Sequence, residues 1–230
     1  MREVVWQPVT LSPALQADDV RANYWMRQVT LRLRREICWC WYERGLLPDS
    51  HQGGLPPFTD KVSAALDMNR FWEEKSAFYR TDPTARYLTE RLGADPPGAE
   101  ERPARGSFGW VVDTLDLDDV SAFVLALGLT VAFDSAVGSV VAACLNDPAK
   151  THPDLALAQK LWDDPDQVLS VADPAHELFG HGLLQLDGQE IDWESEIRVP
   201  WLVANQLLFQ LSPLIGQIAD PVGKLGFFLG

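Results

Sequence analysis

Apolar residues recur at every fourth position through the first long segment of the chain. Residues 17–44 contain neither glycine nor proline, and within them the spacing is kept over Trp25, Val29, Leu33, Ile37 and Trp41. Apolar side chains at this spacing form a stripe on one face of an α-helix. Acidic residues precede the stripe and a glycine follows it at position 45, so the sequence predicts a helix across this segment.

Two shorter helices are predicted after the first. Thr59 can cap a helix over residues 60–79. Its apolar side consists of Val62, Ala65, Leu66 and Trp72. Pro83 suits the first turn of a third helix, which is expected to run to Leu92. Because β-branched residues are few and scattered here, we expect a helical bundle and no sheet.

The second half of the chain contains further helical patterns. The segment 117–127 has acidic residues in its first turn and Gly128 after it, which predicts a helix that ends at this glycine. A second helix is expected over residues 131–145 and a shorter third one over residues 154–162. A last helix is expected over residues 201–211.

A β-hairpin is predicted between the third and the last of these helices. Asp187 and Gly188 stand between two apolar runs, and this dipeptide is typical of a tight two-residue turn. Apolar and charged residues alternate after it, as in a strand with one buried face. The apolar positions are Ile191, Trp193, Ile197 and Val199, and the charged ones are Asp192, Glu194, Glu196 and Arg198. Three helices followed by a two-stranded wing are typical of a winged-helix module.

These patterns predict a mainly α-helical protein with two modules. Residues 93–107 are rich in proline, glycine and charge, a composition typical of a linker. We expect the helical bundle over residues 1–92 and the winged-helix-like module over residues 108–212. Residues 213–230 form an apolar tail, in which Leu214, Phe227 and Phe228 are candidates for contact with a partner.

Charge narrows the classes of partner. The 230 residues include 19 Lys and Arg against 33 Asp and Glu, a formal net charge of −14. Residues 113–196 hold two basic and seventeen acidic side chains, a local charge of −15. Such a segment repels nucleic acid and anionic membranes, so we expect protein partners. With no signal-peptide pattern, no apolar run of membrane-spanning length and only three cysteines, the sequence predicts a cytoplasmic protein.

Two histidines form the most suggestive catalytic motif. His176, Glu177 and His181 resemble the H-E-x-x-H of zinc proteases, with one extra residue before the second histidine. Residues five apart on a helix point about 140° away from each other, so a regular helix cannot aim both rings at one metal. Aromatic amino acid hydroxylases place two histidines at this spacing, with a distant glutamate, around iron. We expect a loop and a strand-start histidine without metal; a metal enzyme that uses both is the alternative.

The sequence contains no other motif that predicts a metal site or a nucleotide-binding site. Cys38 and Cys40 lie about 200° apart on a helix and cannot chelate together. Cys144 is expected as a small buried residue and His152 as a turn residue. A G-x-x-x-x-G-K-[ST] loop does not occur, so no residue is predicted to bind nucleotide and no cofactor is expected.

A further pattern links residues 24–39 with a series of packing motifs in the second half. These motifs lie at residues 117–128, 132–138, 146–148, 152–158, 181–186 and 197–203. Together they resemble the N-terminal region of a bacterial AAA-type ATPase family whose members are often encoded with contractile injection systems. The resemblance implies a winged-helix-like region ahead of an ATPase core, with His181 opening the first strand of the wing. The Walker A, Walker B and arginine-finger segments of that family have no counterpart here, so ATP hydrolysis is assigned to no residue of this chain.

The expected function is therefore protein interaction. The resemblance implies an adaptor or regulatory region that positions an ATPase core on its partners. The expected contacts of this chain are with such a core or with a second copy of itself. Asp192, Glu194 and Glu196 on the wing are the charged candidates for contact. DNA binding through the third helix is an alternative that charge disfavours, because it needs cationic side chains where Lys150 and Lys160 stand among many acids.

Overall fold

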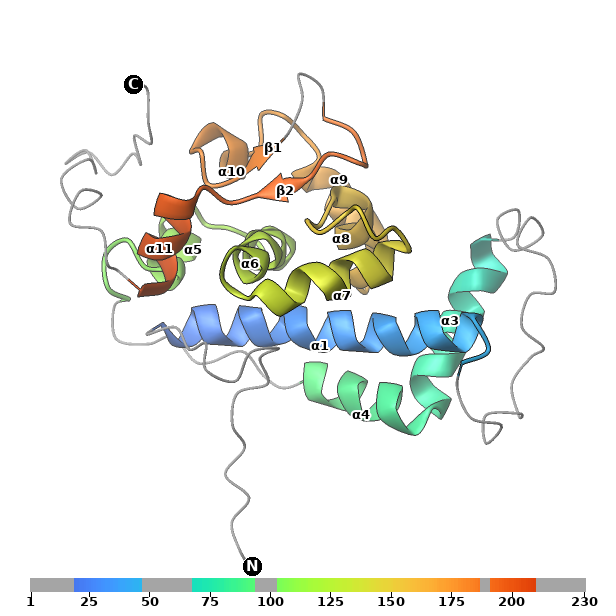
Figure 1. Cartoon of the computed structure of the whole chain (residues 1–230). Helices are drawn as coiled ribbons and strands as arrows, with labels where there is room; N and C mark the ends of the chain where they lie inside the picture. The colour runs from blue at the N-terminus through green and yellow to red at the C-terminus, as the bar shows by residue number, and fades with distance from the viewer. Residues whose placement is uncertain (1–18, 47–67, 94–102, 187–190, 210–230) are drawn as a thin grey trace, which may run out of the picture. The chain divides into compact units, whose positions relative to one another are not determined.

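The computed structural model describes residues 19–46, 68–93, 103–186 and 191–209 (Figure 1). These residues are mainly helical, as the sequence predicts. The chain divides into two compact units, a larger one of Met1–Thr30 with Pro96–Gly230 and a smaller one of Leu31–Asp95. This division differs from the predicted domains, because residues 19–30 belong with the C-terminal part of the chain and not with the predicted bundle over residues 1–92.

Most elements belong to the larger unit. It contains the N-terminal part of α1 (Val20–Glu43) and a series that begins after residue 103. In chain order the series is α5 (Phe108–Thr114), α6 (Asp119–Phe133), α7 (Ser135–Leu145), α8 (Leu155–Leu161), the 3-10 helix η2 (Pro165–Gln167), α9 (Val168–Val171), α10 (Glu177–Gly180), β1 (Gln185–Leu186), β2 (Ile197–Arg198) and α11 (Trp201–Phe209). No described helix is both long and apolar enough to cross a membrane. No apolar period predicts α5, α9 or α10, because helices of one or two turns are too short to show one.

A single buried helix, α6, occupies the centre of the larger unit. Every residue from Val120 to Thr130 is buried. Figure 1 shows α6 nearly end-on, and it contacts α7, α9, α11 and β2. A helix that is apolar on all sides must be covered on all sides, so the neighbouring elements are arranged around it.

The prediction that a helix ends at Gly128 is wrong. α6 continues to Phe133, and Asp134 separates it from α7, which begins at Ser135 and not at residue 131. Gly128 instead lies where the end of β2 crosses the helix. A Cβ atom at Gly128 would lie 2.9 Å from Cγ2 of Val199. Glycine therefore serves close approach at this position, and not helix termination.

Aspartates begin many of the described helices. Their carboxylates accept backbone N–H groups that the first turn of a helix leaves without a partner. The capping residues are Asp19 for α1, Asp82 for α4 (Pro83–Leu92), Asp118 for α6, Asp134 for α7 and Asp154 for α8. Asp19 also accepts the N–H of Gly109 at 2.6 Å, which joins the start of α1 to α5.

The buried face of α1 changes along its length. Leu33 is buried, as the predicted stripe requires, but Ile37 is half-buried and Trp41 is 47% exposed. A spacing of four residues advances about 40° beyond each full turn, so the stripe drifts away from the core. Trp39 and Cys40 are buried in the second half of the helix instead.

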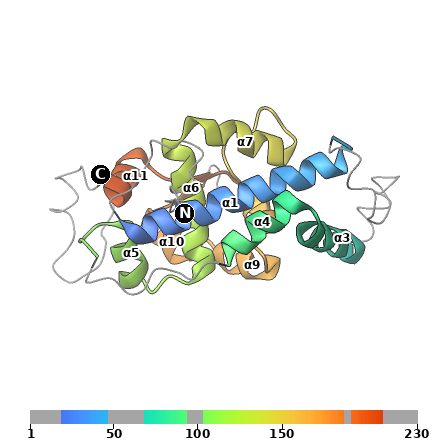
Figure 2. The ribbon, with the colours of Figure 1, turned by 90° about the horizontal axis from the view of Figure 1, so that it is seen from below.

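Aromatic rings connect α1, α6 and α8 within the larger unit. Trp162 directly follows α8, and its ring centroid lies 4.9 Å from that of Phe123 on α6. Trp162 also contacts Trp25 on α1, and the centroids of these two rings lie 6.4 Å apart. Figure 2 shows the first half of α1 crossing α6, in agreement with these contacts.

The two strands pair in a register that excludes the predicted tight turn. Leu186 of β1 lies opposite Ile197 of β2. A two-residue turn at positions 187 and 188 would place Leu186 opposite Gln189 instead. The prediction of a tight hairpin is therefore wrong, since residues 187–196 all lie between the paired ends. Asp187 and Gly188 themselves lie outside the described residues.

A local turn explains why the expected second strand is shorter than its alternating pattern. Asp192 donates its N–H to Oγ of Ser195, and Ser195 Oγ donates back to the Asp192 carboxylate at 2.8 Å. This turn interrupts the alternation: Ile197 and Val199 are buried as predicted, whereas Trp193 is 39% exposed. Ile191 is half-buried. The pattern of apolar positions is thus correct only after the turn.

The smaller unit contains the second part of α1 with α3 (Met68–Thr81) and α4. α4 has the predicted bounds, and the described part of the predicted 60–79 helix begins at Met68; Thr59, Val62, Ala65 and Leu66 lie outside the described residues. Trp39, Phe78 and Ala85 form the core of this unit.

A buried ion pair joins α1 to α3 in the smaller unit. Lys75 Nζ lies 2.6 Å from Oε2 of Glu36, and both side chains are almost fully buried. The hydroxyl of Tyr79 donates to the same oxygen at 3.0 Å. Because either charge would be costly to bury alone, each side chain needs the other as its partner in this buried position.

Replacement of Gly128 tests the close approach of β2 to α6. In Gly128→Ala the new methyl group would overlap Val199, and overpacking costs about 1–3 kcal/mol. This exceeds the gain of about 1 kcal/mol from the higher helix propensity of alanine, so we expect a lower free energy of unfolding in a denaturant titration. Gly180→Ala is the matched control, because a Cβ there meets no atom within 4 Å. Equal stability of Gly128→Ala and the parent would contradict the described packing.

Candidate functional site

The two histidines of the suggestive motif flank a short helix. His176 is the first residue before α10 and His181 the first after it. Nδ1 of His176 accepts the N–H of Leu178 at 3.2 Å. Its Nε2 lies 3.1 Å from Oγ of Ser121, at the start of α6. Both ring nitrogens of His176 are therefore occupied by protein groups.

This placement corrects the expectation for His181. The resemblance implies that His181 opens the first strand of the wing, but β1 begins at Gln185. His181 lies in the turn that follows α10, where its N–H donates to the carbonyl of Glu177. Within the described ranges, no three His, Cys, Asp or Glu side chains gather closely enough to hold a metal ion.

The thiols offer little nucleophilic chemistry. None of the three cysteines forms a disulfide. Burial raises the pKa of the Cys38 thiol, and the nearby charge of Asp82 raises it further. The thiol therefore stays protonated at neutral pH, and the thiolate is the reactive form. Cys40 and Cys144 are buried, as expected for Cys144.

The predicted interaction residues of the wing differ in their surroundings. Glu194 is the most open, with a side chain that is 81% exposed and 3.6 Å from Nζ of Lys150. Glu196 is held by Arg198, whose Nε donates to it at 2.9 Å. Asp192 forms the turn described above. Leu214, Phe227 and Phe228, the candidates in the tail, lie outside the described residues.

Lys150 forms ion pairs with two carboxylates, those of Asp154 and Glu194. Its Nζ donates to the buried carboxylate of Asp154 at 3.3 Å, the residue that caps α8. Desolvation lowers the pKa of Lys150, but the hydrogen bond and charge of Asp154, together with Glu194, raise it more. Its pKa thus lies above the ordinary value for lysine. Lys160, the other cation of this segment, donates to the carbonyl oxygen of Cys144 at 3.3 Å.

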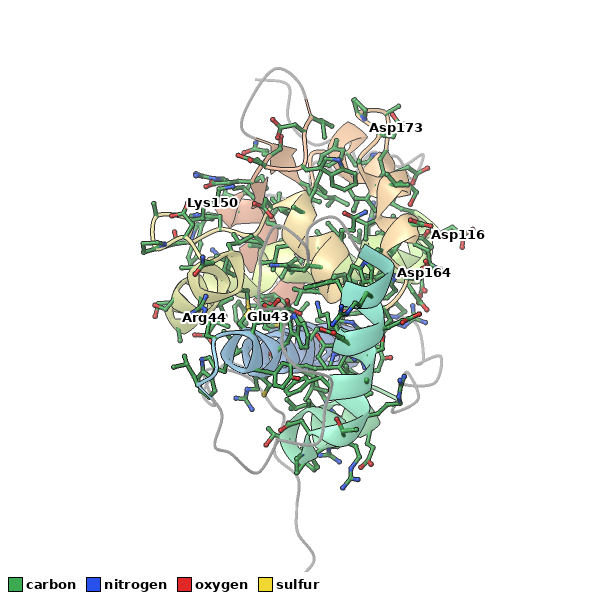
Figure 3. All side chains as sticks on the ribbon, turned by 90° about the vertical axis from the view of Figure 1, so that its right-hand side faces the viewer. Glu43, Arg44, Asp116, Lys150, Asp164 and Asp173 are labelled. Carbon is green, nitrogen blue, oxygen red and sulfur yellow. The ribbon has the colours of Figure 1, made fainter. Side chains whose placement is uncertain are left out.

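Exposed carboxylates gather on one side of the larger unit. Asp116, Asp164 and Asp173 lie along this side, and Lys150 lies on the other (Figure 3). The contact between Ser121 and His176 joins the start of α6 to the start of α10, and α9 contacts both α6 and η2. We call this surface the acidic face and define it by Asp116, Asp164 and Asp173, all of which are exposed.

The sequence shows the charge of this stretch but not the acidic face itself. The residues come from three separate loops, before α6, around η2 and before α10. Their proximity depends on contacts between residues far apart in the chain, such as Ser121 and His176. No local pattern signals such contacts.

Comparisons of the chain with protein-family models, with curated proteins and with solved structures found no match. The resemblance to the N-terminal region of AAA-type ATPases therefore stays a prediction. The geometry of the larger unit is the basis on which a function can be inferred.

We predict that His176→Ala does not change the metal content of the purified chain. Both ring nitrogens already have protein partners, and the spacing of the two histidines does not suit one metal. Metal analysis of the parent, His176→Ala and His152→Ala after purification without chelators measures this directly. Stoichiometric zinc or iron that is lost in His176→Ala alone would show that the assignment is wrong.

Proposed function

We propose that this chain is a non-catalytic protein-interaction region whose larger unit is a winged-helix-like module that contacts a protein partner through the acidic face. The acidic face is the observation that carries the proposal. As the resemblance to AAA-type ATPases implies, the partner would be an ATPase core or the assembly on which that core acts.

The order of the elements supports a winged-helix-like arrangement. Helices α6 to α10 precede the antiparallel pair β1 and β2, which corresponds to the wing. A bridge between Asp154 and Glu196 connects β2 to the segment before α8. Ile197 also donates its N–H to the carbonyl of Pro153 at 2.7 Å. A short third strand of this kind is typical of winged-helix modules.

Charge favours a protein over DNA as the partner. A winged-helix protein that binds DNA places a helix against the major groove and needs cations beside the phosphates. Here the predicted third helix corresponds to α8, and the exposed Asp163, Asp164 and Asp166 follow it directly in the chain. Lys150 and Lys160, the cations of this segment, contact Asp154 and a carbonyl oxygen instead. Phosphates would be repelled at this surface.

An exposed apolar side chain stands among the acidic residues of this part of the chain. Leu169 on α9 is 54% exposed and lies in the chain between Asp166 and Asp173. An apolar centre with a charged rim is the usual anatomy of a protein interface. Carboxylates around it attract a basic partner surface and speed its association. A basic protein surface is thus the complement that this face fits.

Site-specific photo-crosslinking tests the proposal. A photoreactive residue at position 169 samples the acidic face, and one at position 149 is the matched control, since Ala149 is exposed beside Lys150. In cells that produce the chain naturally, we expect a discrete protein adduct from position 169 and none from position 149. Adding Asp164→Lys and Asp173→Lys should abolish the adduct, because the charges that attract the partner are reversed.

Two outcomes would contradict this function. Nucleic acid crosslinked from position 169 would favour the DNA-binding alternative. An adduct that forms equally from both positions, or that survives the charge reversals, would show that the acidic face does not select the partner.

A further inference from the structure

His176 is held between the starts of two helices. Its Nδ1 accepts the N–H of Leu178, so this nitrogen carries no proton. In the neutral ring the proton then lies on Nε2, which donates to Oγ of Ser121 at 3.1 Å. The hydrogen bonds thus define one tautomer of a neutral imidazole.

The residue that His176 caps also positions the first strand of the wing. Leu178 is fully buried. Its carbonyl oxygen accepts the N–H groups of both Leu183 and Leu184, each at 2.9 Å. These two residues lead directly into β1, which begins at Gln185. Leu178 therefore connects the start of α10 to the segment that leads into β1.

Protonation would remove the cap. A proton taken from solvent adds to Nδ1, so both nitrogens become donors and neither can accept the N–H of Leu178. Carboxylates, which a charged imidazole prefers as acceptors, stand close to His176 and to its partner Ser121 in the chain. They are the carboxylates of Asp118 and Asp119 at the start of α6, of Asp173 in the turn before α10, and of Glu177 on α10 itself. A ring that turns toward them leaves α10 without its cap.

We propose that His176 is a proton-sensitive cap that holds α10 and the start of β1 in place when neutral and releases them when protonated. Histidine is the side chain whose charge changes between about pH 8 and pH 5. The ordered form of α10 is expected at the upper end of this range. The proposal does not depend on which partner the acidic face binds.

Amide hydrogen exchange of the full chain, followed by NMR, tests the proposal. After correction for the intrinsic pH dependence of exchange, the protection of Leu178, Leu183 and Leu184 should fall roughly fivefold from pH 8 to pH 5, the scale of a lost helix cap. His176→Asn should abolish this fall, because asparagine caps a helix without titrating. His152→Asn, which changes another histidine of the larger unit, should keep it.

The parent chain alone keeps the proposal testable if His176→Asn does not fold. Imidazole nitrogen shifts should show an unprotonated Nδ1 in His176 at pH 8. A neutral ring with its proton on Nδ1 would overturn the proposal. Protection of Leu178 that is unchanged between pH 8 and pH 5, or that falls equally in a folded His176→Asn variant, would overturn it as well.

Discussion

Burial of α6 on all sides from Val120 to Thr130 is the constraint on which the larger unit depends. Because no side of this segment faces water, α7, α9, α11 and β2 must all lie against α6. The approach of β2 is possible only because Gly128 has no side chain. The paired strands β1 and β2 and the short helices before them therefore take their positions from α6, and the acidic face is formed by the loops that these positions bring together.

Aspartate has two separate uses in this chain. Asp118, Asp134 and Asp154 cap helices, where a carboxylate accepts free N–H groups and interacts favourably with the helix dipole. Others, such as Asp164 and Asp173, are exposed on the acidic face. The net charge that first suggests a class of partner is thus partly structural, and only the exposed carboxylates can select a partner.

Sequence reasoning succeeded where a local signal and the tertiary packing agree. Pro83 after a capping aspartate defines α4, and Asp154 defines the start of α8. It failed at Gly128, where a residue typical of helix ends serves close packing instead. It also failed at the predicted hairpin, because the turn at residues 192–195 and the pairing of Leu186 with Ile197 depend on the surrounding structure. The role of His176 was beyond prediction, since its partner Ser121 is 55 residues away.

In our proposal, the carboxylates of the acidic face repel DNA from the larger unit, although its fold would be compatible with DNA binding. The most direct test is a fluorescence anisotropy titration of labelled duplex DNA at low salt, where electrostatic attraction is strongest. The parent chain is compared with a variant that carries Asp116→Lys, Asp164→Lys and Asp173→Lys. We predict no saturable binding by the parent and salt-dependent binding by the variant. Saturable binding of the parent at about micromolar concentration would contradict the proposal, because a DNA-binding surface would then exist despite the acidic face.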